Sequence, residues 1–261
     1  MPQTLPHHAA AQLALRCLDL TSLNDADTAA DIAALCQRAQ TPYGNVAAVC
    51  VWPSFVALAR GLLPPSVRVA AVANFPDGAL DLARALADVQ QIVAGGGDEV
   101  DVVLPYRTLM DGTPNSAQAC ADFLAQVRAA CGPLTLKVII ESGTLQTPAL
   151  IAHATQLAIA AGADFVKTST GKTAVSATLE AAAVMLRTIA DSGSTTVGFK
   201  ASGGIRTVRD AQPYLALVAE VLGAGALSPQ RFRLGASGLL TDIEAVLGGT
   251  VATATANSGA Y

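Results

Sequence analysis

The chain has 261 residues, a formal net charge of −4, and only 14% charged residues against 52% hydrophobic residues. These values fit one large domain with an extensive core, and the absence of a basic block or an arginine stripe with interleaved aromatic residues excludes nucleic acid as an expected partner. No uninterrupted stretch reaches the roughly 20 apolar residues of a membrane span, and the first residues lack the pattern of a secretion signal, so we expect neither membrane insertion nor export.

Short β-branched runs alternate with alanine-rich segments along the whole chain. We expect eight strands, in chain order Arg16–Leu20, Val46–Val51, Val67–Val72, Glu99–Val103, Leu134–Glu141, Phe165–Thr168, Thr196–Lys200 and Arg231–Gly235. The segments between them place apolar residues at helical spacing, as in Asp81–Ala94, Ser116–Ala130, Pro148–Ala161, Ser176–Ala190 and Val208–Leu222. Eight alternations in a chain of this length favour a single (β/α)₈ TIM barrel.

A doubly wound sheet is the alternative fold, and it is weakened because no G-x-G-x-x-G turn follows the first strand. Gly132 and Gly162 stand where helices are expected to stop before the fifth and sixth strands. We assign residues 1–247 to the barrel and residues 248–261, rich in Gly, Ala, Thr and Ser, to a flexible C-terminal tail that ends in Tyr261.

Only four of the 16 basic residues are lysine, and all four lie at or near the ends of predicted strands. Arginine solvates a surface well, whereas only an ammonium can lose its proton and become a nucleophile. The remaining lysines therefore indicate amine chemistry at the mouth of the barrel, where the carboxyl ends of the strands converge.

Lys167 and Lys200 each end an apolar run, on strands expected to be neighbours roughly 4.8 Å apart. Burial and a like charge both lower the pKa of a lysine, which produces a free amine able to attack a carbonyl and form a Schiff base. Asp101 interrupts a third apolar strand and is expected to exchange protons with these lysines. In the alternative interpretation each lysine only pairs with a carboxylate such as Asp101 or Glu141.

Other polar residues near the strand ends are expected to support the site. Lys137, a strand's depth below Glu141, is a charge partner in the barrel interior rather than a nucleophile. Further supporting positions are Asp19, Thr21, Cys50 and Thr170.

Glycine-rich turns follow the last three predicted strands. Gly171-Lys172-Thr173 resembles the end of a P-loop, but Val166 occupies the position of the earlier glycine, so no triphosphate site is implied. Backbone amides after the seventh and eighth strands of a barrel commonly hold phosphate. We therefore expect a phosphate site built from Gly171, Lys172, Gly203, Gly204, Gly235 and Ser237.

The sequence predicts neither a metal nor a cofactor. The three histidines, His7, His8 and His153, form no ligand cluster, and the chain has no G-x-S-x-G nucleophile elbow. Its five cysteines are odd in number and lack C-x-x-C spacing, which is typical of free thiols in a reducing cytoplasm.

Nearly the whole chain resembles the family of deoxyribose-phosphate aldolases. The motifs that carry the resemblance are Leu18-Asp-Leu-Thr-Ser-Leu-Asn-Asp25, Glu99-Val-Asp-Val-Val103, Lys137-Val-Ile-Ile-Glu141, Ala163-Asp-Phe-Val-Lys-Thr-Ser-Thr-Gly-Lys172, Gly198-Phe-Lys-Ala-Ser-Gly-Gly204 and Leu234-Gly-Ala-Ser237. The resemblance implies a class I (β/α)₈ aldolase that reversibly cleaves 2-deoxy-D-ribose 5-phosphate to acetaldehyde and D-glyceraldehyde 3-phosphate without a cofactor, and it implies a homodimer.

The resemblance also implies roles for individual residues. Lys167 forms the imine, Lys200 lowers its pKa, Asp101 relays protons with an ordered water, and Tyr261 reaches toward the active site. The chain departs from the family pattern at two places, with Ala201-Ser202 in place of Pro-Ala and Gly238 in place of a serine. The second departure removes a hydroxyl, which bears on phosphate affinity and on tolerance of unphosphorylated aldehydes. A different class I aldolase or a transaldolase, and a phosphosugar-binding barrel without turnover, remain alternatives.

Overall fold

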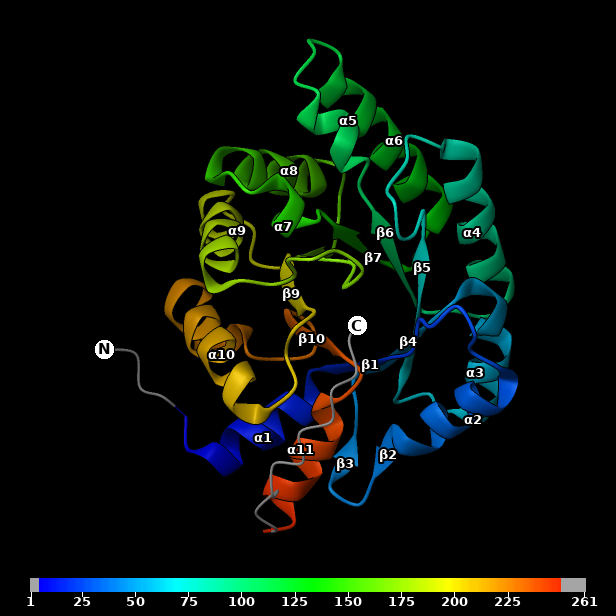
Figure 1. Cartoon of the computed structure of the whole chain (residues 1–261), viewed down its shortest axis with the longest axis vertical. Helices are drawn as coiled ribbons and strands as arrows, with labels where there is room; N and C mark the ends of the chain where they lie inside the picture. The colour runs from blue at the N-terminus through cyan, green and yellow to red at the C-terminus, as the bar shows by residue number, and fades with distance from the viewer. Residues whose placement is uncertain (1–4, 250–261) are drawn as a thin grey trace.

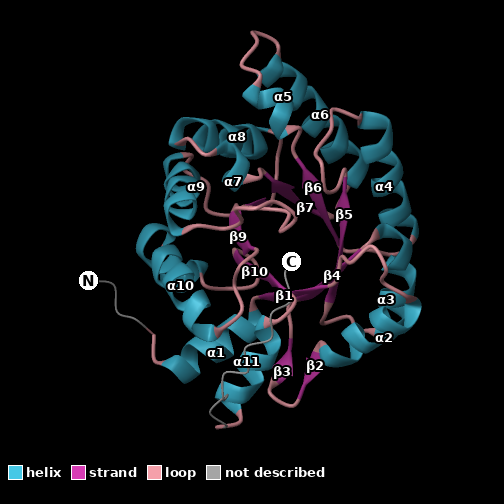
Figure 2. Cartoon of the chain, in the orientation of Figure 1, coloured by secondary structure: helices cyan, strands magenta, loops and turns pink. Residues whose placement is uncertain are grey.

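The computed structural model of the chain describes residues 5–249. In Figure 2 eight strands that form one closed barrel ring the centre of the molecule, and the long helices lie outside them. The barrel strands are β1 (Leu18–Thr21), β4 (Ala48–Val51), β5 (Arg68–Ala73), β6 (Glu99–Val103), β7 (Thr135–Ile139), β8 (Phe165–Lys167), β9 (Gly198–Ser202) and β10 (Phe232–Ala236). They pair in parallel and close through contact of β1 with both β4 and β10, which confirms the predicted (β/α)₈ barrel.

Helices cover the outside of the barrel, and their apolar faces form the core against the strands. They are α1 (His7–Arg16), α2 (Ala29–Arg38), α3 (Val56–Leu62), α4 (Leu82–Ala94), α5 (Tyr106–Met110), α6 (Ser116–Cys131), α7 (Ser142–Leu145), α8 (Pro148–Ala160), α9 (Leu179–Asp191), α10 (Val208–Leu222) and α11 (Leu239–Leu247). The remaining elements are the short hairpin β2 (Gln40–Thr41) and β3 (Gly44–Asn45) and the 3₁₀ turns η1 (Pro53–Phe55) and η2 (Ala224–Ala226). Figure 1 shows α1 against α10 and α11, so the two ends of the described chain meet on one side of the barrel.

Local signals explain several helix boundaries. Thr28 and Thr207 each form a capping box with the acid three residues later, and these boxes start α2 and α10. Gly132 takes a positive φ of 54° directly after α6, and Gly162 takes a φ of 79° just after α8, as expected of the residues that reverse the chain.

Several predicted boundaries are wrong by a few residues, each for a local reason. Arg16 belongs to the last turn of α1 rather than to the first strand. The helix expected from Ser176 begins at Leu179, because the Thr178 hydroxyl caps it by accepting a hydrogen bond from the Ala181 amide. The expected fifth strand ends at Ile139, because Glu141 turns into the left-handed region with φ 54° and α7 follows at once.

The predicted division at residue 248 falls just after α11, which ends at Leu247. Thr250 to Tyr261 lie outside the described residues, so the flexible tail and its Tyr261 stay predictions.

Candidate active site

The interior of the barrel holds charged side chains in place of the branched apolar residues that usually fill this fold. They form an interior charge network of four cations, Lys137, Lys167, Lys200 and Arg233, and three carboxylates, Asp19, Glu99 and Asp101. None of these side chains belongs to a residue more than 5% exposed. The network therefore works in a dry environment, where charges interact strongly.

Asp101 lies at the centre of this network and contacts three lysines. Its Oδ2 accepts hydrogen bonds from Lys167 Nζ and Lys200 Nζ, both at 2.8 Å, and its Oδ1 accepts one from Lys137 Nζ at 2.6 Å. The strand register brings these groups together, because Lys167 pairs with Lys200 across β8 and β9 and Asp101 pairs with Lys137 across β6 and β7. Lys137, Lys167 and Lys200 thus each pair with a carboxylate, as the alternative interpretation of the sequence expected.

Arg233 and Glu99 complete the network, and the sequence analysis did not include them in the site. Arg233 donates to Asp19 Oδ1 at 2.6 Å and to Glu99 Oε1 at 2.8 Å, while Glu99 Oε2 lies 2.6 Å from Lys137 Nζ. Asp19 also accepts from Lys200 Nζ at 2.5 Å. The sequence does contain a signal for both residues. Side chains two positions apart in a strand lie on the same face, so Glu99 shares a face with Asp101. Arg233 interrupts an apolar strand, as the lysines do.

The network has one more cation than it has carboxylates when every lysine is protonated. A buried excess charge is costly, so the loss of one proton from a lysine stabilises the network. Lys167 Nζ contacts a single carboxylate, whereas Lys200 Nζ and Lys137 Nζ each contact at least two. Lys167 is therefore the lysine that gives up its proton at the lowest cost.

The pKa shifts of the three lysines also point to Lys167 as the one that loses its proton. Burial has the largest effect on the pKa of Lys167 and lowers it; the charge of Asp101 acts to raise this pKa, and the positive charge of Lys200 lowers it further, so that it ends below its ordinary value. Burial also acts to lower the pKa of Lys200 and of Lys137, but the surrounding carboxylates outweigh it and raise both. For Asp101 burial acts to raise the pKa, and the three lysines outweigh it and hold the pKa well below its ordinary value.

A second buried carboxylate group organises the loop that follows β8. Glu141 Oε2 accepts hydrogen bonds from the Thr170 hydroxyl at 2.5 Å and from the Thr170 amide at 3.3 Å, and Glu141 Oε1 accepts one from Thr173 Oγ1 at 3.2 Å. Within residues 5–249 Glu141 makes no ion pair with a lysine, in contrast to the alternative interpretation. Lys172, between the two threonines, is exposed.

The predicted phosphate residues fall on adjacent loops at the same end of the barrel. Gly171, Gly203 and Gly204 all have positive φ, at 80°, 86° and 81°. A Cβ on Gly203 would lie 3.5 Å from the Gly171 Cα and 2.5 Å from Ser176, so the loops after β8 and β9 are in close contact. Ser237 is exposed just before α11.

Gly235, by contrast, is buried within β10. A Cβ there would lie 2.0 Å from Ser202 Oγ and 3.0 Å from Lys200 Cε. Its lack of a side chain thus makes room for Lys200, and this packing role was not part of the expectation.

The other supporting residues lie at the ends of β1 and β4. Thr21 Oγ1 donates to the Asp19 carbonyl at 2.9 Å, and Thr21 pairs in register with Cys50. Burial raises the pKa of the Cys50 thiol, and the nearby charge of Asp101 adds to this. Tyr261 lies outside the described residues.

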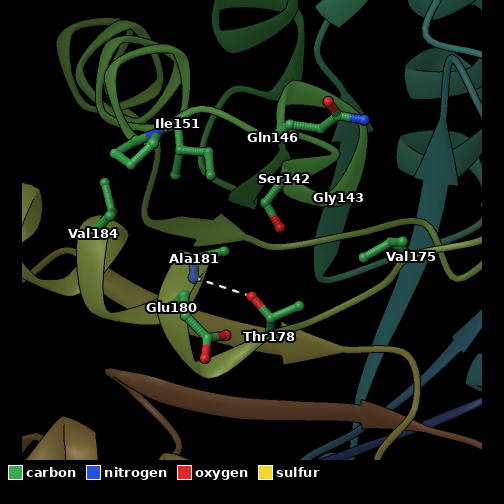
Figure 3. Close-up of a pocket in the computed structure, with 10 residues that line it drawn as sticks. Ser142, Gly143, Gln146, Ile151, Val175, Thr178, Glu180, Ala181 and Val184 are labelled. Atoms are coloured by element: carbon green, nitrogen blue, oxygen red, sulfur yellow. Dashed lines mark hydrogen bonds between the residues drawn. The ribbon is translucent and has the colours of Figure 1, made fainter.

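A groove of about 290 Å³ lies between α7, α8 and α9, behind the loop that carries Lys172. In Figure 3, Ser142 and Gly143 of α7 lie above Thr178 and Ala181, and Val175 lies at the right, beside Gly143. The groove is lined by none of the interior charge network, so it is separate from the barrel interior.

Among the described residues, no group of three or more His, Cys, Asp or Glu side chains is arranged to hold a metal ion. None of the helices described is long and apolar enough to cross a membrane.

Fold and site together define a barrel with a buried amine of lowered pKa. The family model described as DeoC/LacD family aldolase matches residues 13–239. A curated deoxyribose-phosphate aldolase of Agrobacterium fabrum is 50% identical over 247 residues, which cover 94% of this chain and 93% of that protein. The chain belongs to the DeoC/LacD family of aldolases, as the resemblance implied.

Solved structures share the fold. The structure of the deoxyribose phosphate aldolase of Aeropyrum pernix, described as a unique tetramer, superposes with a TM-score of 0.72 at 26% identity and covers 90% of this chain and 91% of that one. A Toxoplasma gondii structure superposes with a TM-score of 0.85 at 22% identity, over 95% of this chain and 99% of its own. The second likeness concerns the barrel architecture alone.

Proposed function

We propose that this aldolase reversibly cleaves 2-deoxy-D-ribose 5-phosphate to acetaldehyde and D-glyceraldehyde 3-phosphate through an imine on Lys167. The observation that carries the proposal is the position of Lys167, a buried amine with a lowered pKa, 2.8 Å from Asp101 and beside the ammonium of Lys200. The curated relative with half of its residues identical is a deoxyribose-phosphate aldolase, which supports the substrate.

The reaction begins when the free amine of Lys167 attacks the aldehyde carbon C1 of the open-chain sugar. The carbinolamine loses water to give a protonated imine, with Asp101 in reach to accept and return the protons. A base removes the proton of the C3 hydroxyl, C3 becomes a carbonyl, and the electrons of the C2–C3 bond move into the imine. D-glyceraldehyde 3-phosphate leaves, and the enamine that remains is protonated at C2 and hydrolysed to acetaldehyde.

Lys200, Asp19 and Lys137 maintain the electrostatics of this cycle. Lys200 keeps its charge because Asp101 and Asp19 surround it, and that charge favours the neutral form of Lys167. Lys137 neutralises Asp101 from the opposite side and is too strongly paired to act as a nucleophile. Thr21 and Cys50 line the strand ends next to these groups.

The glycine-rich loops are proposed to hold the phosphate of the substrate. Gly171, Lys172, Gly203 and Gly204 supply backbone amides and one cation, and Ser237 adds a hydroxyl beside the start of α11. Gly235 contributes by keeping space for Lys200. An exchange of Lys172 for alanine should weaken binding of the phosphorylated sugar more than that of free 2-deoxyribose.

The nucleophile is tested by the variant Lys167→Arg. A guanidinium stays protonated at all working pH values, so turnover of 2-deoxy-D-ribose 5-phosphate should fall by ~10³-fold or more. The assay is the release of acetaldehyde, coupled to its reduction. Retained turnover in this variant would overturn the assignment and favour a different amine.

The proposal extends to the assembly and the location of the enzyme. We propose a homodimer, to be tested by light scattering after size exclusion; the Aeropyrum pernix relative is described as a tetramer. We also propose that the enzyme works in the cytoplasm, because all five cysteines are free and buried, with burial raising the pKa of Cys17 to about 12.

A further inference from the structure

Glu141 is a fully buried carboxylate that differs from the three acids of the interior charge network. Asp19, Glu99 and Asp101 each contact a lysine or arginine, whereas Glu141 contacts hydroxyl and amide groups of one loop. Its backbone takes the left-handed conformation, with φ 54° and ψ 56°, at the point where the chain leaves β7. This conformation is unusual for a residue with a long side chain and indicates a local requirement.

The hydrogen bonds of Glu141 lead to Lys172. The Thr170 hydroxyl accepts a hydrogen bond from the Lys172 amide at 3.0 Å, so its own proton is free to go to Glu141. On the other side of Lys172, the Thr173 hydroxyl contacts Glu141 at 3.2 Å and the Val175 carbonyl at 3.1 Å. One carboxylate therefore holds both flanks of the Gly171-Lys172 turn.

Other packing holds the later part of the loop rather than the Gly171-Lys172 turn: a Cβ on Gly143 would lie 2.0 Å from the Val175 carbonyl oxygen, and a Cβ on Gly203 would lie 2.5 Å from Ser176. Gly171 faces open space, and Val175 is 49% exposed. Val175 and Thr178 also line the groove beside α7 and α8 (Figure 3). The Ala177 amide to Ser202 carbonyl bond at 3.3 Å anchors only the end of the loop.

We propose that Glu141 is a positioning residue that fixes the loop after β8 and so places Lys172 and the Gly171 amide for the phosphate of the substrate. This inference rests on the proposed function. It assigns to Glu141 an effect on the preference for phosphorylated over unphosphorylated sugars, and no effect on imine formation at Lys167.

The test compares Glu141→Ala with the unaltered enzyme on two substrates, 2-deoxy-D-ribose 5-phosphate and free 2-deoxyribose. For the phosphorylated sugar kcat/KM should fall by ~10-fold or more, mainly through KM, because binding is lost rather than chemistry. For the free sugar it should change by less than ~3-fold. Equal losses on both substrates would contradict the positioning role and indicate general damage to the barrel.

A double-mutant cycle with Lys172→Ala sharpens the result. If Glu141 acts through the loop that carries Lys172, Glu141→Ala should add little to the loss already caused by Lys172→Ala. Fully additive losses would contradict that route. Trapping of acetaldehyde on Lys167 should stay at the level of the unaltered enzyme in both variants, so failure of trapping in the unaltered enzyme marks a failure of the proposed function instead.

Three further variants keep the outcome clear if Glu141→Ala folds poorly. Glu141→Gln should retain the preference for the phosphorylated sugar. The carbonyl of the glutamine side chain can accept a hydrogen bond from Thr170, and its amide can donate one to the Thr173 hydroxyl. That hydroxyl can still donate to the Val175 carbonyl. Thr173→Val should show a smaller loss in the same direction. Ser142→Ala is the matched control, since the buried Ser142 hydroxyl has no hydrogen-bond partner among the described residues, and it should leave both substrates unaffected. A glutamine variant as impaired as the alanine variant would contradict the hydrogen-bonded frame.

Discussion

At the scale of single residues, the neighbours of Lys167 decide its chemistry more than burial alone does. Burial acts to lower the pKa of all three interior lysines, yet only that of Lys167 is lowered in the network. The difference comes from carboxylates: Lys200 has both Asp19 and Asp101, while Lys167 has only Asp101. A nucleophilic amine thus arises because the network has one carboxylate fewer than it has cations.

Removal of the charge on Lys200 should reverse this shift. In Lys200→Leu the network has as many carboxylates as cations, so Lys167 keeps its proton and its pKa rises. The pH at which imine formation reaches half its maximum should move upward by about one unit or more, each unit corresponding to ~1.4 kcal/mol. The measurement is the pH profile of borohydride trapping, with Lys172→Ala as a variant outside the network for comparison. An unchanged profile would refute the influence of Lys200.

Sequence reasoning could reach the lysines and Asp101 because a charge inside an apolar strand is conspicuous. It could not distinguish which lysine has which partner, since that depends on the register of β7, β8 and β9 and on Arg233 reaching across from β10. The role of Glu141 was also hidden, because its hydrogen bonds to Thr170 and Thr173 join segments some 30 residues apart.

At the scale of elements, close contacts between neighbouring strands limit the size of the side chains that fit in the barrel. Gly198 in β9 lies where a Cβ would meet the ring of Phe165 in β8 at 2.4 Å and the Arg231 carbonyl at 2.8 Å. Phe165 in turn stacks beneath Arg233, whose guanidinium lies 5.5 Å from the ring centre. Because Gly198 has no side chain, the Phe165 ring has room to lie where it contacts Arg233 of the interior charge network.

Gly198→Ala should lower the free energy of unfolding by ~1–3 kcal/mol, because the added methyl group overpacks the contact between Gly198 and the Phe165 ring. Gly61→Ala is the matched control, since Gly61 lies within α3 in open space, and it should be neutral or slightly stabilising. Urea denaturation followed by circular dichroism measures both. Equal stability of the two variants would contradict the packing account.

The order of strands and long helices could be predicted, because the barrel strands are short apolar runs buried on both faces and each long helix buries one face at helical spacing. The short elements could not be predicted in this way. The hairpin of β2 and β3 has two residues in each strand, and α7 has four, so neither is long enough to show a period. The late start of α9 depends on Thr178 capping the helix rather than on its apolar pattern.

At the scale of the whole molecule, the charge network links stability to pH. The folded pKa values of Asp19 and Asp101 lie below their values in the unfolded chain, about 3.9. Their contribution to stability is therefore complete above the unfolded pKa and is lost as the pH falls through the folded pKa. We expect the free energy of unfolding to fall steeply as the pH drops below about 4.

Urea titrations at a series of pH values test this dependence. Asp101→Asn should show a flatter decline below about pH 4, because one of the two carboxyl groups of the interior charge network with a lowered pKa is gone. It should also be less stable at neutral pH by ~3–5 kcal/mol, since its three lysines lose their shared partner. Equal slopes for the variant and the unaltered protein would assign acid unfolding to surface carboxylates instead.

The most direct measurement is borohydride reduction in the presence of acetaldehyde, followed by intact mass and peptide mapping. We expect a single ethyl adduct, located on Lys167, and none when Lys167 is replaced by arginine. An adduct on Lys200 or Lys137 would contradict the assignment of the nucleophile, and no adduct at all would favour a barrel that binds phosphosugars without turning them over.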